Sequence, residues 1–438
     1  MSALPKENCL TAPDERLGIA ALTRQAFEGK DMTEIASRLL IEISKNPGNA
    51  GALMDLSVIE QIRGNTQTGL DYQRNALIHK NLYRTGSGEK KRLTLLVLAA
   101  PIHMGGNTPV EMLLENANVE IITVFIAPGL PVPETLPPHD LIMIAAPGDT
   151  GSVVSIMPGI QPKDYLEEIR NFLDGVTLPV INKAEPIFRL ERDLLGETLG
   201  ETPGVRVPLT ARLETGQIRH SLHQGDVPAA GNASFDYPFV IRPVGSHAGF
   251  GFEMIRSAEG LEAYLKAYEF PEYFLSELVD YRSQDGQFRK YRIMFVDSEA
   301  FPCHMAIGDT WKLWYMNAKM EECTLKRMEE AAFMIQFRET FSDHLAKLDM
   351  IASRIGLDYF GIDCAICEDG SLVVFEADNA MIAHDMDPVD IYPYKGPAMR
   401  NMFKAFETML AKRSVAGSTE PQVQSNEPSS GRRWVRIG

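Results

Sequence analysis

Three glycines and a serine separate two short apolar segments near the middle of the chain. The first segment, 237–243, ends in Arg242 and Pro243, the loop 245–251 follows, and a second segment covers Phe252–Ile255. Glycine lets backbone amides approach an anion because no Cβ lies in the way. A strand rather than a helix follows the loop, so neither the P-loop nor the dinucleotide-binding fingerprint applies. We expect a β-hairpin whose tip can bind phosphate, with a plain glycine-rich hairpin as the alternative.

Two later segments carry carboxylates and form a second expected hairpin. The runs Gly361–Ala365 and Leu372–Asn379 are typical of strands, and residues 368–370 between them are typical of a tight turn. Clustered carboxylates repel one another unless a cation lies among them, and oxygen ligands favour Mg²⁺. The hairpin therefore predicts a magnesium site made by three side chains that it brings into one neighbourhood: Asp363, Glu376 and Asp378.

The preceding part of the chain alternates between strand and helix patterns. Helices are expected over Pro109–Asn116 and Tyr165–Leu173. Strands alternating with helices imply a parallel sheet with covered faces. The expected strands are Leu93–Ala99, Val119–Ile126, Leu141–Ala145 and Val180–Ile181.

Helices are also expected from about Leu17 to Tyr83. Apolar residues between positions 32 and 43 recur at the spacing of one helix face, and Asn46–Asn49 interrupts that pattern. The stretch Pro47–Leu77 resembles one tetratricopeptide unit. Since at least three repeats are usually needed for an array, we interpret residues 1–84 as a helical cap, with a peptide-binding solenoid as the alternative. A partner protein or a second copy of the chain could bind through these helices.

Composition narrows the class of protein. The chain has 438 residues, 45% apolar and 23% charged, with a net charge of −16. A negative field of this size repels phosphate backbones, so nucleic-acid binding is not expected. No apolar run reaches the roughly 20 residues that span a bilayer, no secretory signal is visible, and five cysteines do not suggest a disulfide framework. A soluble protein of the cytoplasm, with no membrane partner, is expected.

The order of these parts resembles the ATP-grasp superfamily. The series is a cation-ended strand, the glycine loop, a Glu-bearing strand at Tyr273–Val279, an Arg-bearing strand at Tyr291–Val296, and the acid hairpin. The resemblance covers about Leu93 to Lys412. It implies an α+β and α/β multidomain protein. The parts it covers would be a Rossmann-like α/β domain (92–181) and an ATP-grasp domain (182–412, lid about 200–278, base about 279–412). The helical cap (1–84) precedes them, and the Ser, Pro, Gln, Asn and Gly content of residues 413–438 predicts a disordered tail.

The resemblance also implies residue roles in binding ATP and Mg²⁺. Arg242, which stands where the family has lysine, would contact the α-phosphate, and either Arg189 or Arg192 would be an earlier cation. Either Asp285 or Asp280 would accept the ribose hydroxyls, and Arg292 would be the catalytic cation near the transferred phosphate. The loop over the β- and γ-phosphates would be made by Gly245, Ser246, Gly249 and Gly251. The adenine-binding segment would be Glu277, Leu278 and Val279. The Mg²⁺ ligands would be Asp363, Glu376 and Asp378.

A ligase is the function that the resemblance implies. A carboxylate from a small molecule or peptide would be activated as an acyl phosphate and joined to an amine or thiol, with release of ADP and phosphate; carbon–nitrogen bond formation is the expected type. Two alternatives stay open. One is a non-catalytic nucleotide-binding scaffold with a helical partner-binding region, and the other is an ATP-grasp kinase. The three clustered acids favour an enzyme, because a scaffold has no need of them.

Overall fold

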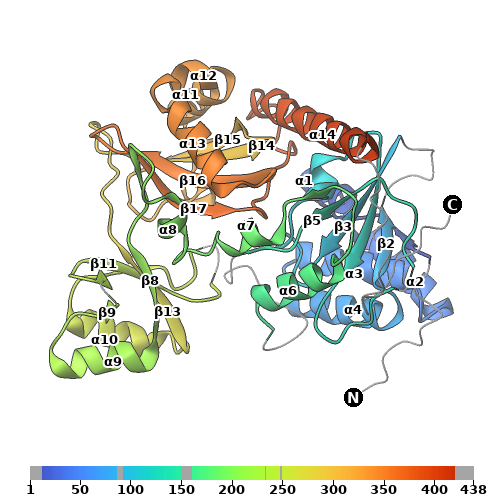
Figure 1. The fold of residues 1–438 in the computed structure, drawn as a ribbon, viewed down its shortest axis with the longest axis horizontal. Helices are drawn as coiled ribbons and strands as arrows, with labels where there is room; N and C mark the ends of the chain where they lie inside the picture. The colour runs from blue at the N-terminus through green and yellow to red at the C-terminus, as the bar shows by residue number, and fades with distance from the viewer. Residues whose placement is uncertain are drawn as a thin grey trace. The chain divides into compact units, whose positions relative to one another are not determined.

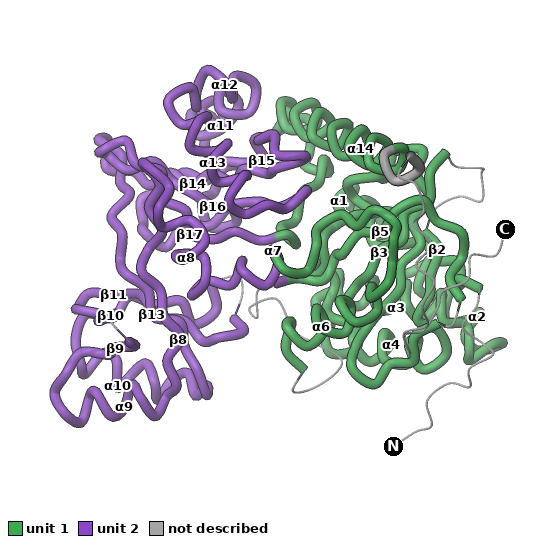
Figure 2. Tube along the Cα trace, in the orientation of Figure 1, with its two compact units in different colours: residues 1–147, 153–185, 379–438 green, residues 148–152, 186–378 purple. Residues whose placement is uncertain are grey.

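The computed structural model describes residues 12–85, 92–133, 135–148, 160–231, 233–246 and 249–419. The chain forms two compact units (Figure 2). Unit 1 contains residues 1–147, 153–185 and 379–438, and unit 2 contains residues 148–152 and 186–378. These boundaries differ from the expected ones, because the N-terminal helices, the α/β region and the C-terminal segment belong to one unit.

A six-stranded sheet is the centre of unit 1. Its strand order is β1-β2-β4-β3-β5-β6. The four strands β3 to β6 pair in parallel, as the alternating pattern predicted, whereas β2 runs antiparallel to β4 and β1 parallel to β2. The N-terminal region therefore contributes strands as well as helices. The strands are β1 (Asp14–Arg16), β2 (Leu82–Thr85), β3 (Leu93–Ala99), β4 (Val119–Phe125), β5 (Leu141–Ile144) and β6 (Val180–Ile181).

The helices of unit 1 follow the local signals in the sequence. Asn49 begins α3 by accepting a hydrogen bond from the amide of Ala52 at 3.1 Å, which is the usual role of an N-cap side chain. Apolar residues of α3 and α4, such as Met54 and Leu77, pack against Tyr83 and Phe125 of the sheet. The helices are α1 (Ile19–Phe27), α2 (Thr33–Lys45), α3 (Ala50–Ile62), α4 (Thr66–His79), α5 (Val110–Leu113) and α6 (Pro162–Phe172), with α7 (Ala184–Phe188) at the junction with unit 2.

The last helix, α14 (Lys395–Thr419), returns the chain to unit 1. Its buried face contains Met402, Phe406, Met409 and Leu410. The expected start of a disordered tail at 413 is wrong, because α14 continues to Thr419. The rest of the expected tail, 420–438, lies outside the described residues. Among the helices that the structure describes, α14 included, none has the length and apolar character to cross a membrane.

Unit 2 contains a four-stranded antiparallel sheet in the order β12-β11-β13-β8. Helices α9 and α10 lie together along one side of this sheet (Figure 1). Ile218 of α9 and Leu261 of α10 pack with Phe239 and Leu275 of the strands in one apolar core. The elements are β8 (Thr210–Glu214), α9 (Thr215–Gln224), β9 (Ala229–Ala230), β10 (Ala233–Ser234), β11 (Phe239–Pro243), β12 (Glu253–Ile255), α10 (Ala258–Ala267) and β13 (Glu272–Glu277).

A five-stranded sheet in the order β15-β14-β16-β17-β7 forms the rest of unit 2. The four strands from β15 to β17 in this order are antiparallel neighbours, and short β7 adds in parallel to β17. The strands are β7 (Val205–Arg206), β14 (Phe288–Val296), β15 (Glu299–Gly308), β16 (Tyr359–Ile366) and β17 (Leu372–Asp378). The helices are α8 (Leu195–Leu199), α11 (Thr324–Ile335), α12 (Phe337–Thr340) and α13 (Leu345–Ile355), with 3₁₀ turns at Tyr315–Asn317, Met320–Glu322 and Ser342–His344.

Candidate functional site

The glycine-rich segment forms the expected hairpin. Strand β11 pairs antiparallel with β12, with Phe239 opposite Ile255. Three glycines of the loop have positive φ: Gly245 at 84°, Gly249 at 75° and Gly251 at 61°. These are left-handed conformations in which a side chain is strained, so glycine is required by the turn itself. His247 and Ala248 lie outside the described residues.

Arg242, at the end of β11, turns back onto its own loop. Its Nε donates to the hydroxyl of Ser246 at 3.2 Å, and its Nη2 donates to the Ser246 carbonyl oxygen. The Arg242 guanidinium carbon also lies 6.0 Å from the centre of the Phe252 ring. The cation therefore lies beside the glycine loop, as the sequence predicted, with its donors engaged by that loop.

Charged side chains gather on one face of the five-stranded sheet. Arg292 on β14 is opposite Asp363 on β16, which is opposite Glu376 on β17. Side chains directly opposite each other in an antiparallel sheet point to the same face. Asp378 is two residues from Glu376 on β17, so it shares that face. The hairpin thus brings the three predicted acids to one face, next to the predicted catalytic arginine.

Asp363 is held between two cations. Arg292 donates from Nε to Oδ1 at 2.8 Å and from Nη2 to Oδ2 at 3.2 Å, and the Nζ of Lys290 lies 2.9 Å from Oδ2. Asp363 is buried. Burial alone would raise the pKa of its carboxyl, but Arg292 and Lys290 outweigh burial and hold that pKa well below its ordinary value. Asp363 is therefore a carboxylate at neutral pH.

Lys290 was missed in the sequence reasoning. It lies two residues before Arg292 on β14. Because alternate residues of a strand face the same way, this period-2 relationship was a signal that could have identified it. His304 of β15, opposite Arg292, was missed as well. A signal was available here too, because β15 follows β14 after only Asp297 and Ser298 and pairs with it as a hairpin.

Glu376 forms an ion pair with Arg192 across 184 residues of sequence. The two side chains are 21% and 14% exposed. Of the two arginines left open by the sequence, Arg189 and Arg192, it is Arg192 whose guanidinium reaches the acid-bearing strand. This contact brings a third cation to the face that carries Arg292 and Lys290.

The three acids do not form a ready-made metal centre. Among the residues that the structure describes, no group of three or more His, Cys, Asp or Glu side chains is arranged to hold a metal ion. Asp363 is paired with Lys290 and Arg292, and Glu376 is paired with Arg192. The oxygen donors suit Mg²⁺ in kind. Their arrangement in this structure is that of ion pairs, so the metal assignment stays a prediction.

The expected nucleoside-binding residues lie at the end of β13 and in the segment between β13 and β14. The Glu277 carboxylate, at the end of β13, is paired with Arg206, and Val279 is buried two residues later. Asp285 lies in an exposed turn, where both of its oxygens accept from Arg289 at 2.9 and 2.8 Å. The other ribose candidate, Asp280, is likewise paired with an arginine, Arg282.

The glycine hairpin also contacts the segment that follows β15. The Nζ of Lys312 lies 3.1 Å from Oε1 of Glu253 on β12, and the rings of Phe252 and Trp311 are 5.3 Å apart. The hydroxyl of Tyr281 donates to the Trp311 carbonyl at 2.7 Å. These contacts join the two sheets of unit 2, so the loop and the charged strands belong to one compact body.

Comparisons with known proteins found no matching family model and no match among curated proteins. Among solved structures, the RimK domain protein ATP-grasp from Sphaerobacter thermophilus DSM 20745 is 14% identical, with 74% of this chain and 99% of that chain covered, at a TM-score of 0.40. The VanG D-Ala:D-Ser ligase from Enterococcus faecalis is 13% identical, with 75% of this chain and 100% of that chain covered, at a TM-score of 0.43. Likenesses at this level assign neither a family nor an activity to the chain.

Proposed function

We propose that unit 2 binds MgATP and uses it to activate a carboxylate for ligation, as the motif order resembling ATP-grasp enzymes implies. The observation that carries the proposal is the paired charge on one sheet face. Arg292 and Lys290 flank Asp363, and Arg192 pairs with Glu376. Arginine and lysine side chains form charge-assisted hydrogen bonds with phosphate, and the glycine hairpin of the same unit supplies a backbone able to approach an anion.

In the proposed reaction, an oxygen of the substrate carboxylate attacks the γ-phosphorus and the bond to the β-phosphate oxygen breaks, which releases ADP. An amine then attacks the acyl carbon, and phosphate leaves. Arg292 would neutralise charge on the transferred group, and Arg242 with the loop of Gly245, Ser246, Gly249 and Gly251 would hold the phosphates. Mg²⁺, held by Asp363, Glu376 and Asp378, would supply neutralisation of phosphate charge.

Binding is tested first by thermal unfolding with nucleotide. A ligand that binds only the folded state raises the melting temperature by mass action. We expect ATP at millimolar concentration to stabilise the protein only when Mg²⁺ is present. GTP, which carries the same phosphates on a different base, is the control nucleotide. Absence of any shift with MgATP would overturn the proposal for unit 2.

The reaction type is tested with ¹⁸O-labelled carboxylates. Pools of labelled amino acids and peptides, incubated with MgATP and unlabelled amines, should yield ADP and phosphate that carries one labelled oxygen. A stable phosphorylated product without ligation would favour the kinase alternative. Labelled AMP with pyrophosphate would contradict the acyl-phosphate route, because the label then reports adenylation.

A further inference from the structure

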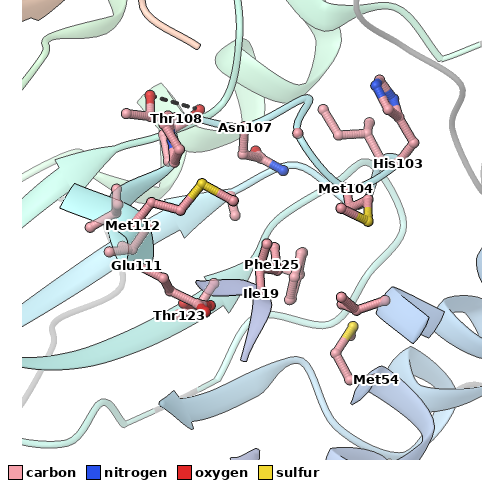
Figure 3. A pocket seen from close by; sticks show the side chains of 18 of the residues that line it. Ile19, Met54, His103, Met104, Asn107, Thr108, Glu111, Met112, Thr123 and Phe125 are labelled. Atoms are coloured by element: carbon pink, nitrogen blue, oxygen red, sulfur yellow. Dashed lines mark hydrogen bonds between the residues drawn. The ribbon is translucent and has the colours of Figure 1, made fainter. Parts of the chain in front are cut away.

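Unit 1 contains a cavity of about 70 Å³ between the strands β3 and β4 and the helices α3 and α4. Figure 3 shows Met54, Met104 and Phe125 around this space. The ion pair in its wall, Arg16 with Glu111, is neutral as a pair, and most of the lining is apolar. Such a lining specifies no ligand chemistry, so the cavity carries no proposal.

The glycine loop of unit 2, residues 245–251, is fixed at both of its ends. At the entry, two nitrogens of Arg242 donate to Ser246. At the exit, the hydroxyl of Tyr264 on α10 donates to the Gly251 carbonyl oxygen at 2.6 Å. These contacts come from the sheet that carries the loop and from a helix packed on that sheet. They do not place the loop relative to the five-stranded sheet.

The segment 311–317, which follows β15 of the five-stranded sheet, supplies that second set of contacts. The Nζ of Lys312 lies 3.1 Å from Oε1 of Glu253, on the strand that leaves the loop. A Cβ placed on Gly249 would lie 3.5 Å from Cζ3 of Trp314 and 3.8 Å from Cε of Lys312. Those are van der Waals contact distances, so the backbone of the loop rests against this segment.

The segment is itself held by hydrogen bonds. The Oδ1 of Asn317 accepts from the amide of Trp314 at 2.9 Å, and its Nδ2 donates to the Lys312 carbonyl oxygen at 2.8 Å. Buried Tyr281 donates from its hydroxyl to the Trp311 carbonyl oxygen at 2.7 Å. A fixed segment can hold a loop in one conformation. A loop that is ordered before its ligand arrives loses less entropy on binding.

We propose that Lys312 is a positioning residue, which acts through Glu253 to hold the glycine loop in the conformation that binds phosphate. The inference rests on the proposed function, because it takes the loop to bind the phosphates of a nucleotide. The side chains of Lys312 and Glu253 are 26% and 46% exposed. Pairs as exposed as this contribute little to folding stability, so its loss should change affinity without unfolding the protein.

The test measures the Kd of MgADP by titration calorimetry on the full chain. Lys312→Met should raise the Kd about fivefold, because the loop must then be ordered on binding. Lys312→Arg keeps the ion pair and should bind within about twofold of the wild type. Lys266→Met is the matched control, since it removes an exposed pair with Glu262 on α10 and should bind as the wild type does.

Glu253→Met separates positioning from a direct contact between lysine and phosphate. A positioning lysine loses its anchor in this variant, so the Kd should rise as it does in Lys312→Met. The double variant should then be no weaker than either single one, because both act through one contact. A lysine that binds phosphate directly would instead be released for its ligand. A Kd that falls or stays unchanged in Glu253→Met would therefore overturn the proposal.

Tryptophan emission reports the contact with the loop in the absence of nucleotide. The chain has three tryptophans, and two of them, Trp311 and Trp314, flank Lys312. The ring of Trp311 lies 5.3 Å from that of Phe252, at the exit of the loop. In Lys312→Met the emission should shift to longer wavelength, because release of the loop exposes these rings to water, and in Lys266→Met it should not. Unchanged emission in folded Lys312→Met would contradict the positioning role.

The outcomes distinguish this inference from the proposed function. A wild type that binds no MgADP overturns the proposed function, and the role of the loop with it. Binding by the wild type that Lys312→Met leaves unchanged overturns the positioning role alone. Should Lys312→Met fail to fold, Glu253→Met decides by the same comparisons of Kd and emission.

Discussion

Arg292 donates to both carboxylate oxygens of Asp363, at 2.8 and 3.2 Å, across 71 residues of sequence. The Asp363 side chain is 7% exposed and that of Arg292 is 23% exposed. Removal of one partner of a buried pair leaves an uncompensated charge and typically costs about 3–5 kcal/mol. The proposed catalytic arginine therefore also supports the fold. A substitution that removes its charge would change stability and turnover together.

The first prediction separates these roles with two substitutions. Arg292→Leu should lower the melting temperature by about 10 °C, because Asp363 then has only Lys290 as its partner. Arg292→Lys should keep the melting temperature within a few degrees. It should still reduce ATP turnover at least tenfold, since a point charge replaces a two-pronged donor. Calorimetry and phosphate release measure the two effects.

Arg338→Leu is the matched control for this prediction. Arg338 forms an exposed ion pair with Glu299 at 2.7 Å. Exposed pairs contribute about 0–1 kcal/mol, so this variant should change neither stability nor turnover. A stable Arg292→Leu protein with normal turnover would contradict both roles assigned to Arg292.

The second prediction concerns Glu376. Glu376→Gln keeps a side-chain oxygen that can accept from Arg192, so it should change the melting temperature little while removing the Mg²⁺-dependent part of stabilisation by ATP. Thermal unfolding with ATP, with and without Mg²⁺, measures this. Glu368→Gln in the exposed turn of the same hairpin is the control and should behave as wild type. Retention of the Mg²⁺ effect in Glu376→Gln would exclude Glu376 as a ligand.

The third prediction is a pH dependence in unit 1. Burial raises the pKa of Asp55 to about 6, above its ordinary 3.8, and outweighs the amides of Leu17 and Gly18 that donate to it. The protonated form therefore favours the folded state. Its contribution is complete below pH 4 and is lost as pH rises through about 6. The difference between the two pKa values corresponds to roughly 3 kcal/mol.

Urea unfolding at several pH values between 4 and 7 measures this contribution. The free energy of unfolding of the wild type, relative to that of Asp55→Asn, should fall as pH rises. Asp71→Asn, at an exposed α4 carboxylate that pairs with Arg74, is the control. A wild-type advantage over Asp55→Asn that stays constant with pH would show that Asp55 does not titrate in this range.

The fourth prediction concerns how much of the C-terminal segment is needed for a stable fold. A chain ending at Thr419 should melt within about 1 °C of the full chain and keep its response to MgATP. A chain ending at Asn401 should be strongly destabilised, because it loses Met402, Phe406, Met409 and Leu410 from the buried face. Differential scanning fluorimetry of both truncations measures this. A large loss of stability on removal of 420–438 alone would show that this segment contributes to the fold.

Much of the local structure could be read from the sequence. Two short, largely apolar runs identified β16 and β17, and a turn with Gly370 at φ 77° joins them. The turn sets Ile366 opposite Leu372, and a one-residue shift of register between Cys364 and Asp363, which the pattern did not specify, then brings Asp363 opposite Glu376. The glycine hairpin was likewise predictable, because its glycines are required by positive φ angles within one short loop. Features of this kind depend on neighbours in the chain, so the sequence by itself determined them.

The tertiary structure alone decided the pairing of the charges and the composition of the units. Arg192 meets Glu376 across 184 residues, and Lys290 reaches Asp363 because β14 pairs with β16, a strand far along the chain. The cavity of unit 1 depends on the packing of α3 and α4 against β3 and β4. Periodicity reveals which face of an element is apolar, but the partner of that face is selected by the summed burial and closure of the whole chain. For that reason the residues of the site were predictable one by one, whereas their contacts were not.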